Sequence, residues 1–382
     1  MKKVLLLSLV FFVLIVPLRA QVSVGQYSFT EDLKHPYTPF KMQGNTGTCW
    51  SFATISFWES ELIRQGKGSL DLAEMYVVRH AYKEKAANYI LRQGSARFTQ
   101  GGLAHDVIRL IDTYGIVPQG VYDQKGTKDG KYNHTELYNT LKAYVDTVIA
   151  TQKRGVRVDW RVGVDRLLDR FFGEVPKEFA YQGKSYNAKS FAQYLGLKAE
   201  DYVTLTSFSH HPYYRPFILE VPDNWSNGLH YNLPLDELVH VLDYALDHGF
   251  TVEWDADTHN NGFSNTLGLA VAPQQDVSKI EKGKKDQFLA SAVHAEKEIS
   301  QTFRQQLFED YTITDDHLMH ITGRAKDQHG NIFYYTKNSS GDGIRPTKGY
   351  IYASLPYIRL HTISFMVHKD AMPHLIRAKL NL

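Results

Sequence analysis

The sequence predicts an α+β protein whose helices and strands occur in separate runs along the chain. Two observations support this class. Apolar residues recur at helical spacing through most of residues 49–172, whereas residues 317–338 contain two strand-like segments joined by a turn. The 382 residues can bury a large core, which is needed because a single cysteine allows no internal disulfide.

The first twenty residues have the composition of a signal peptide. Lys2 and Lys3 precede an almost wholly apolar run over residues 4–16, and Ala20 offers a cleavage position. The run is shorter than the roughly 20 residues that cross a bilayer as a helix, and no later stretch is long and apolar enough. We therefore expect an exported protein, periplasmic or secreted, that begins at Gln21 and has no membrane span in the mature chain.

The net charge argues against nucleic acid as a partner. The full chain carries a formal charge of +2, and signal-peptide cleavage would remove Lys2, Lys3 and Arg19, which leaves −1. Electrostatic attraction to a phosphate backbone or an acidic membrane surface requires an excess of positive charge. We therefore expect no nucleic-acid partner.

The single cysteine, Cys49, stands at the start of a predicted helix that continues to about Arg64. A thiol in the first helical turn lies among unpaired backbone N–H groups, which favours the thiolate and lowers its pKa from ~8.5 towards ~3.5–7.5. Gly44 and Gly47 allow the preceding chain to turn and bring Gln43 back towards the sulfur. The Gln43 amide could then join the Cys49 N–H in stabilising an oxyanion. The alternative is that Cys49 is a small buried hydrophobic residue.

These residues carry a resemblance to a known family. The run from Gln43 to Phe52 resembles the nucleophile signature of papain-like cysteine peptidases, and residues 49–53 with residues 59–62 resemble the bleomycin hydrolase/aminopeptidase C family. The resemblance implies a papain-like fold with a helical lobe that carries Cys49, a β-barrel-like lobe and helical insertions. It implies hydrolysis of peptides through a Cys49 thioester, with removal of N-terminal residues as the expected activity and endopeptidase cleavage as the alternative. It implies no metal or organic cofactor.

A pair of glycines, Gly101 and Gly102, precedes an amphipathic helix predicted over residues 103–114. In papain-like enzymes such a pair lines the pocket for the second substrate residue, so the resemblance makes both glycines substrate-binding candidates. Without the resemblance, the pair is simply a loop. Residues 70–78 form another helix-like segment, which we expect to pack beside the Cys49 helix.

Residues from about 130 to 175 form a unit of their own. Two apolar helical stripes are separated by Gly155, which predicts a helical hairpin inserted into the enzyme. The apolar residues are Leu137, Leu141, Val145, Val148, Val164, Leu167, Leu168 and Phe171. In the resembled family such insertions take part in subunit contacts, which implies a homo-oligomer, a hexamer in that family. The alternative is that both stripes pack on their own subunit.

His210 and His211 are adjacent in a segment that reads as a loop. Paired histidines can bind a metal, but no carboxylate or further histidine stands at ligand spacing beside them, so we expect no metal site. Further along, residues 235–246 form an amphipathic helical pattern, and residues 250–254 read as a strand. This order of helix and strand also resembles the family.

A β-hairpin is expected to supply the partners of the cysteine. A thiolate of this class needs an imidazole and a group that orients the imidazole. Residues 317–323 and 331–338 are strand-like and are joined by a turn at residues 327–330. Paired positions in such a hairpin have a constant index sum, here about 657, so His317 and Asn338 lie almost opposite each other. Both positions match the family's motifs, which implies that His317 is the general acid/base and Asn338 its orienting partner.

His317 also belongs to an HxxH pattern with His320, which is a competing zinc interpretation. Positions three apart on a strand point to opposite faces, so we interpret His320 as structural. The separation between Cys49 and His317 is about twice the ~130–150 residues of a minimal papain-like chain. The predicted insertions account for this excess.

One residue departs from the family pattern. Asn338 is followed by Ser339 and Ser340, whereas the family has a serine and then a tryptophan that shields the Asn–His hydrogen bond from water. A net hydrogen bond is worth about 0.5–1.5 kcal/mol, so weakening it would slow the reaction by up to roughly tenfold. On this ground we expect Ser340→Trp to raise turnover. Ser340 also motivates the alternative function, a catalytically impaired papain-like protein that binds peptides.

The carboxyl-terminal arm covers about residues 368–382. In the resembled family this arm lies in the cleft, and its terminal carboxylate, here that of Leu382, receives the free amino group of the substrate. The alternative is a solvent-exposed tail. The predicted organisation is therefore a signal peptide over residues 1–20 and one papain-like peptidase domain over residues 21–382, with peptides as substrates.

Overall fold

The computed structural model describes residues 21–123, 131–281, 283–340 and 347–382. The predicted signal peptide, residues 1–20, lies outside these ranges. Within them, no helix combines the length and the apolar character needed to cross a membrane.

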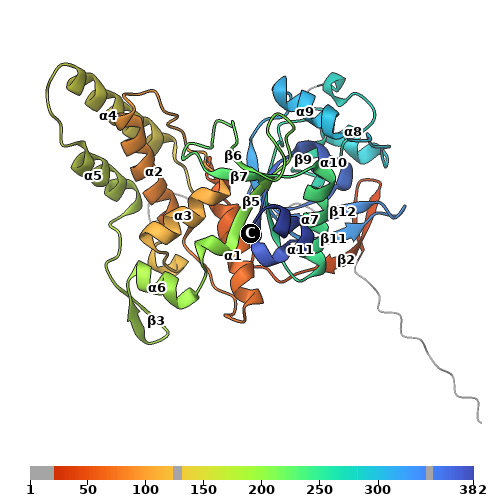
Figure 1. The fold of residues 1–382 in the computed structure, drawn as a ribbon, viewed down its shortest axis with the longest axis horizontal. Helices are drawn as coiled ribbons and strands as arrows, with labels where there is room; N and C mark the ends of the chain where they lie inside the picture. Colours follow the sequence, from red (N-terminus) through yellow and green to blue (C-terminus); the bar gives the residue numbers. More distant parts are fainter. Residues whose placement is uncertain (1–20, 124–130, 282, 341–346) are drawn as a thin grey trace, which may run out of the picture.

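Helices dominate the first half of the chain and flank the sheet in the second half. Their bounds are α1 Cys49–Arg64, α2 Glu74–Leu91, α3 Ala104–Tyr114, α4 Thr135–Lys153, α5 Trp160–Phe172, α6 Ala188–Leu195, α7 Leu235–Asp247, α8 Lys285–Ser291, α9 Gln301–Glu309, α10 Leu355–His361 and α11 His374–Lys379. Figure 1 shows α2 to α6 gathered on one side of the molecule and most strands on the other, with α1 between them. The predicted α+β class is confirmed.

Most of the strands belong to one large sheet. Their bounds are β1 Gln21–Val24, β2 Tyr27–Lys34, β3 Phe179–Tyr181, β4 Lys184–Tyr186, β5 Tyr202–Thr206, β6 Pro216–Ile218, β7 Leu229–Asn232, β8 Val252–Ala256, β9 Phe263–Ser264, β10 Leu269–Ala270, β11 His317–Lys326, β12 Ile332–Lys337, β13 Tyr350–Ser354 and β14 Thr362–His368. The sheet runs β6-β7-β5-β14-β8-β11-β12-β13-β10-β9, β2 also pairs with β11, and β3 pairs with β4 separately. The strand that begins at His317 is therefore central.

The centre of the sheet is covered by α1 on one face and by α7 on the other. Trp254 of β8 is buried in one core with Leu242 of α7. The next residue, Asp255, points to the opposite face because side chains alternate along a strand. On that face α1 packs against β8 and β11, and Ser56 forms a 2.9 Å hydrogen bond with His320.

The helical hairpin predicted within residues 130–175 is formed by α4 and α5. Both helices pack on α2, and they pack on each other. Leu141 and Val145 of α4 and Val164 and Leu168 of α5 are all buried within this chain. The apolar stripes are therefore covered by their own subunit.

The hairpin of β11 and β12 has the predicted register. His320 pairs with Lys337 and Ile321 with Thr336, so each pair has the index sum expected from the sequence. The register shifts between Ile321 and Gly323, where β11 carries a bulge. Before the bulge β11 pairs with β8, and after it β11 pairs with β2.

The second helix begins later than its sequence pattern predicts. The pattern favours a helix over residues 70–78, whereas α2 starts at Glu74 and continues to Leu91. Leu72 instead forms an isolated bridge with Pro118, and its backbone N–H donates to Glu59 of α1 over 2.8 Å. This extended stretch joins the start of α2 to the middle of α1.

Candidate active site

Cys49 is the first residue of α1, at the place where the sequence puts it. Only 8 % of its surface is exposed. The side chain of the preceding Thr48 makes no capping hydrogen bond, so no side chain caps the first N–H groups of α1 from that position. The thiol therefore lies at the positive end of a helix.

The strand β11 brings the residue after His317 into contact with this thiol. His317 is the first residue of β11, and α1 packs along the strand. The backbone of the following residue, Leu318, forms a hydrogen bond with the Cys49 thiol. The imidazole and the thiol therefore belong to two segments in direct contact.

The orientation of the His317 imidazole is set by Asn338. His317 Nε2 lies 2.7 Å from Asn338 Oδ1. The backbone N–H groups of Ser339 and Ser340 also donate to this oxygen, over 2.7 and 3.2 Å, which identifies it as the carbonyl end of the amide. An amide oxygen only accepts, so Nε2 carries the proton and Nδ1 is the free acceptor. The structure thus brings together the two residues that are paired in the sequence-based prediction. The His317 imidazole is in the tautomer that can take a proton from a thiol.

The other end of the Asn338 amide is held as well. Asn338 Nδ2 donates to Asn265 Oδ1 and to Ser340 Oγ, each over 3.1 Å. Asn265 Nδ2 also donates to Ser340 Oγ, over 2.9 Å. The family pattern has a tryptophan at the position of Ser340. In this protein, polar side chains hold the Asn338 amide instead, and the hydroxyl of Ser340 is one of them.

The environment of Cys49 raises its pKa. Burial, with a further contribution from the carboxylates of Asp255, Asp315 and Asp223, raises the pKa of the thiol to about 12. The hydrogen bond from the Leu318 backbone acts in the opposite direction. The lowered thiol pKa expected from the helix position is therefore wrong for the substrate-free site, because burial and three nearby carboxylates outweigh the helix end.

Burial also governs His317. It lowers the pKa of the imidazole, whereas the hydrogen bond with Asn338 and the charge of Asp316 raise this pKa and His259 lowers it. Asp316 is held by Thr258, whose backbone N–H donates to it over 3.1 Å. The substrate-free site therefore favours a neutral thiol beside a neutral imidazole. Asn338 and Asp316 stabilise the imidazolium that proton transfer creates.

Gln43 links the loop before α1 to the loop after β12. Its Oε1 accepts from Ser339 Oγ over 2.7 Å, and its backbone N–H donates to the Ser339 carbonyl over 2.8 Å. Its Nε2 donates to the Thr46 carbonyl over 2.7 Å, and the same amide group has a second N–H. Gln43 is therefore anchored beside the residue that follows Asn338, with a donor left for an oxyanion.

Gly101 and Gly102 lie close against neighbouring side chains. The ring of Trp50 is 3.1 Å from the position that a Cβ on Gly102 would occupy, and a Cβ on Gly101 would overlap the carboxylate of Asp223. Trp50 is also tied to this loop, because its Nε1 donates to the Gln100 carbonyl over 3.0 Å. The structure brings both glycines beside the Cys49 helix, and their contact with substrate stays a prediction.

The structure does not bring Leu382 together with these residues. Leu382 packs against the core on the α7 side of the sheet, in which Ile376 and Leu380 are buried. Its backbone N–H donates to the Arg377 carbonyl over 3.2 Å. Cys49 begins the helix on the opposite face. The predicted role of the Leu382 carboxylate in binding a substrate amino group therefore stays a prediction, without support from these contacts.

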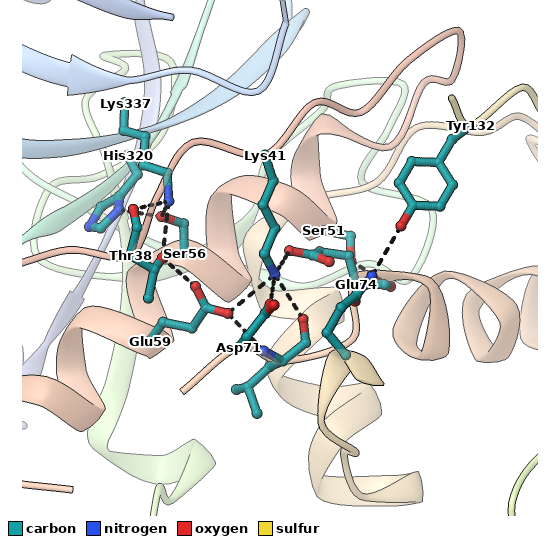
Figure 2. A network of polar contacts seen from close by, with 12 residues as sticks. Thr38, Lys41, Ser51, Ser56, Glu59, Asp71, Glu74, Tyr132, His320 and Lys337 are labelled. Carbon is teal, nitrogen blue, oxygen red and sulfur yellow. Dashed lines mark hydrogen bonds and ion pairs between the residues drawn. The ribbon is translucent and has the colours of Figure 1, made fainter. Parts of the chain in front are cut away.

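A buried polar network underlies the site (Figure 2). Lys337, which precedes Asn338, donates to Ser56 Oγ and to the Thr38 carbonyl, each over 2.8 Å. Thr38 Oγ1 in turn donates to Glu59. Ser56 and Glu59 both belong to α1. The network therefore joins the strand that leads to Asn338 to the helix that begins with the nucleophile.

Several residues of this site were not predicted from the sequence. Asp315 and Asp316 directly precede His317, so two carboxylates next to the histidine motif were a visible signal. Asn265 and Asp223 carry no such signal, because they lie on loops far from both motifs in the chain. Their proximity follows from the fold alone.

The structure corrects the interpretation of His210 and His211. Glu220 lies 3.1 Å from His210 Nε2 and 2.7 Å from His211 Nε2, and these atoms are close enough to share a metal ion. The expectation that no carboxylate stands beside them is therefore wrong, because the loop folds back on itself. However, Gln305 Nε2 donates to His210 Nδ1 over 3.0 Å while its Oε1 accepts from Ser209. His210 Nε2 therefore carries a proton and donates to Glu220.

Comparisons with known proteins agree with this geometry. The Peptidase C1-like family matches residues 88–381. Aminopeptidase C of Streptococcus thermophilus is 26 % identical over 378 residues, which cover 86 % of this chain and 80 % of that protein. Aminopeptidase C of Lactococcus lactis subsp. cremoris is 22 % identical over 372 residues, which cover 87 % of this chain and 81 % of that protein.

Among solved structures, PepW from Lactobacillus rhamnosis shares the fold. Its TM-score is 0.71 at 18 % identity, over 92 % of this chain and 84 % of that chain. The papain-like fold expected from the sequence is confirmed. With its family match spanning most of the sequence, the chain belongs to the Peptidase C1-like family.

Proposed function

We propose that the protein is a cysteine peptidase that removes N-terminal residues from peptides. The observation that carries the proposal is the 2.7 Å hydrogen bond between His317 and Asn338. His317 directly precedes Leu318, whose backbone binds the Cys49 thiol. The fold and the family support cysteine-peptidase chemistry. Similarity to two proteins named Aminopeptidase C supports the preference for N-terminal residues.

In the proposed reaction each of these residues has one role. Cys49 Sγ attacks the carbonyl carbon while His317 Nδ1 takes the thiol proton, and the carbonyl electron pair moves to oxygen. The Cys49 N–H and the Gln43 amide donate to this oxyanion. The imidazolium, oriented by Asn338, protonates the leaving amine as the C–N bond breaks and a thioester forms. Water then attacks the thioester with His317 as general base, which releases the acid and restores the thiol.

Turnover of paired substrates tests this function. Aminoacyl fluorogenic amides are compared with their N-blocked equivalents under reducing conditions, using protein from Gln21 onward. Cleavage of the free-amine substrates alone, lost in Cys49→Ala, is the expected result. Cleavage of blocked substrates would indicate an endopeptidase, and cleavage of neither would contradict the proposal.

A peptide-binding protein with impaired catalysis is the second candidate. It is motivated by Ser340, which replaces the tryptophan of the family pattern. The hydroxyl of Ser340 accepts from Asn338, so the residue contributes to the orientation of the site instead of removing it. Peptide affinity without measurable turnover in the same assay would favour this candidate over the enzyme.

Export is a further proposal. It is supported by Lys2 and Lys3 followed by the apolar run over residues 4–16. N-terminal sequencing of the protein from its own cells tests it. A mature N-terminus at Gln21 is expected, and an intact Met1 would contradict export.

Assembly into a homo-oligomer is proposed from the resemblance alone, because the apolar stripes of α4 and α5 are covered within the subunit. Light scattering on protein from Gln21 onward gives the mass directly. A multiple of the chain mass is expected, and a monomer at micromolar concentration would contradict the proposal.

A further inference from the structure

Three carboxylates from separate segments converge near the thiol. Asp223 lies against Gly101, and its backbone N–H donates to Asp315 Oδ2 over 3.3 Å. Asp255 of β8 pairs with Leu318 of β11, whose backbone binds the Cys49 thiol. The loop after β6, the segment before β11 and the end of β8 therefore all present a carboxylate to one region.

Asp255 is an unpartnered acceptor in this region. It is completely buried, on the face of the sheet that carries α1. Its Oδ1 has no hydrogen-bond partner among the described residues, and its Oδ2 has a long 3.5 Å contact with Ser364 Oγ. A buried carboxylate oxygen without a donor is costly, and a cation bound nearby would reduce this cost.

The neighbouring cations do not neutralise the cluster. Arg97 Nε pairs with Asp223 Oδ1 over 2.9 Å at the outer edge, where its side chain is about half exposed. Lys85 is buried, but its Nζ donates to the Thr99 and Gly101 carbonyls. Among the described residues, neither cation forms an ion pair with Asp315 or Asp255, so the cluster has more carboxyl groups than paired cations.

The carboxyl groups of the cluster have raised pKa values. Burial and the charges of Asp223 and Asp316 raise the pKa of Asp315 to about 7. Burial and the charges of Asp315 and Glu253 hold the pKa of Asp255 well above its usual range. A bound cation would remove this penalty, because a positive charge favours the ionised form of a carboxyl group.

An organic cation fits this arrangement better than a metal ion. Among the described residues, the group whose ligand atoms are close enough to share a metal is His210, His211 and Glu220, and the three aspartates do not form such a group. Carboxylates spread over a wider region suit an ammonium group, whose three N–H donors point in different directions.

We infer that Asp223 and Asp315, with Asp255 behind them, form a subsite at Gly101 that binds an ammonium group of the substrate. The inference rests on the proposed function, because it assigns the substrate class of the same site. The ammonium group is either the free α-amino group of the N-terminal residue or a basic side chain. In the first case the subsite recognises a free N-terminus without any contribution from Leu382.

Calorimetry on the inactive Cys49→Ala protein tests the subsite without turnover. The ligands are norleucyl-alaninamide, its N-acetyl derivative and N-acetyl-lysyl-alaninamide. We expect at least one ammonium-bearing ligand to bind about tenfold or more tightly than the N-acetyl norleucyl ligand. Tighter binding of norleucyl-alaninamide identifies the α-amino group, and tighter binding of the lysyl ligand identifies a basic side chain. Equal affinities for all three ligands would overturn the inference.

Two variants in the same background locate the effect. Asp315→Asn should remove most of the preference for ammonium. Asp159→Asn, an exposed carboxylate at the start of α5, should leave the preference unchanged. If Asp315→Asn does not fold, the comparison of the three ligands on the Cys49→Ala protein still tests whether the site prefers an ammonium group. Failure of the proposed function appears separately, as absence of turnover in the active protein.

Discussion

Asn265 Oδ1 accepts a hydrogen bond from Asn338 Nδ2 over 3.1 Å. The same Asn338 amide presents Oδ1 to His317, so a flip of the amide would place a donor against the imidazole N–H. Asn265 opposes that flip, because it holds the nitrogen end of the amide in place. It therefore acts as a positioning residue for His317, through Asn338.

Replacing Asn265 with alanine should lower kcat while changing KM little. The variant loses one hydrogen bond that orients Asn338, worth about 0.5–1.5 kcal/mol, so we expect a loss of up to roughly tenfold. Asn261→Ala is the matched control, because Asn261 lies just before β9 and its amide donates to the Val277 carbonyl over 2.8 Å instead of to Asn338. Equal losses of kcat in the two variants would contradict the positioning role.

Ser340→Trp should lower turnover, which reverses the expectation from the family pattern. The hydroxyl of Ser340 accepts from Asn338 and Asn265, and an indole offers no acceptor of this kind. Steady-state kcat for wild type, Ser340→Ala and Ser340→Trp gives the comparison. A kcat above wild type in Ser340→Trp would instead support the view that a tryptophan at this position shields the Asn338–His317 hydrogen bond from water.

Asp316→Asn should shift the pH profile of the enzyme. The charge of Asp316 raises the pKa of His317 and partly offsets the burial that lowers it. Without that charge the His317 pKa falls further, so the neutral imidazole that takes the thiol proton persists to a lower pH. The acidic limb of kcat/KM should therefore move to lower pH. An unchanged or higher acidic limb would show that Asp316 does not act on His317.

Lys337 should make stability depend on pH in the alkaline range. Burial lowers its pKa from 10.5 to about 8, although Glu59 acts in the opposite direction. Between these values the unfolded chain binds the proton more tightly than the folded protein, so the contribution of Lys337 to stability rises with pH.

The comparison with Lys337→Met isolates this contribution. The difference in free energy of unfolding, wild type minus variant, should rise between about pH 8 and pH 10.5, by up to roughly 3 kcal/mol. Chemical denaturation at several pH values measures it. A difference that stays constant or falls over this window would contradict the buried, weakly basic state of Lys337.

The elements predicted well from the sequence have local signals. The start of α1 at Cys49 follows from helical spacing and the preceding glycines. The register of β11 and β12 follows from the position of the turn, apart from a shift of one residue at the bulge between Ile321 and Gly323. The contact between His317 and Asn338 required no long-range information beyond that register.

What the sequence could not supply depends on contacts between distant segments. The direction of the Cys49 pKa shift depends on burial and on carboxylates from three parts of the chain, so a rule about helix ends gave the wrong sign. Asn265 and Glu220 were missed for the same reason, because folded loops place them beside Asn338 and His210. The carboxyl-terminal arm resembles that of the family in position along the chain, yet its contacts are on the α7 side of the sheet.

The most direct test of catalysis by Cys49 and His317 is the rate at which an epoxide alkylates the thiol. The chain has one cysteine, so mass spectrometry reports labelling at Cys49 alone. We expect one label per chain in wild type, at a rate about tenfold or more above that of His317→Ala. His329→Ala, an exposed histidine in the turn of the same hairpin, should react like wild type. Equal rates in wild type and His317→Ala would contradict activation of Cys49 by His317.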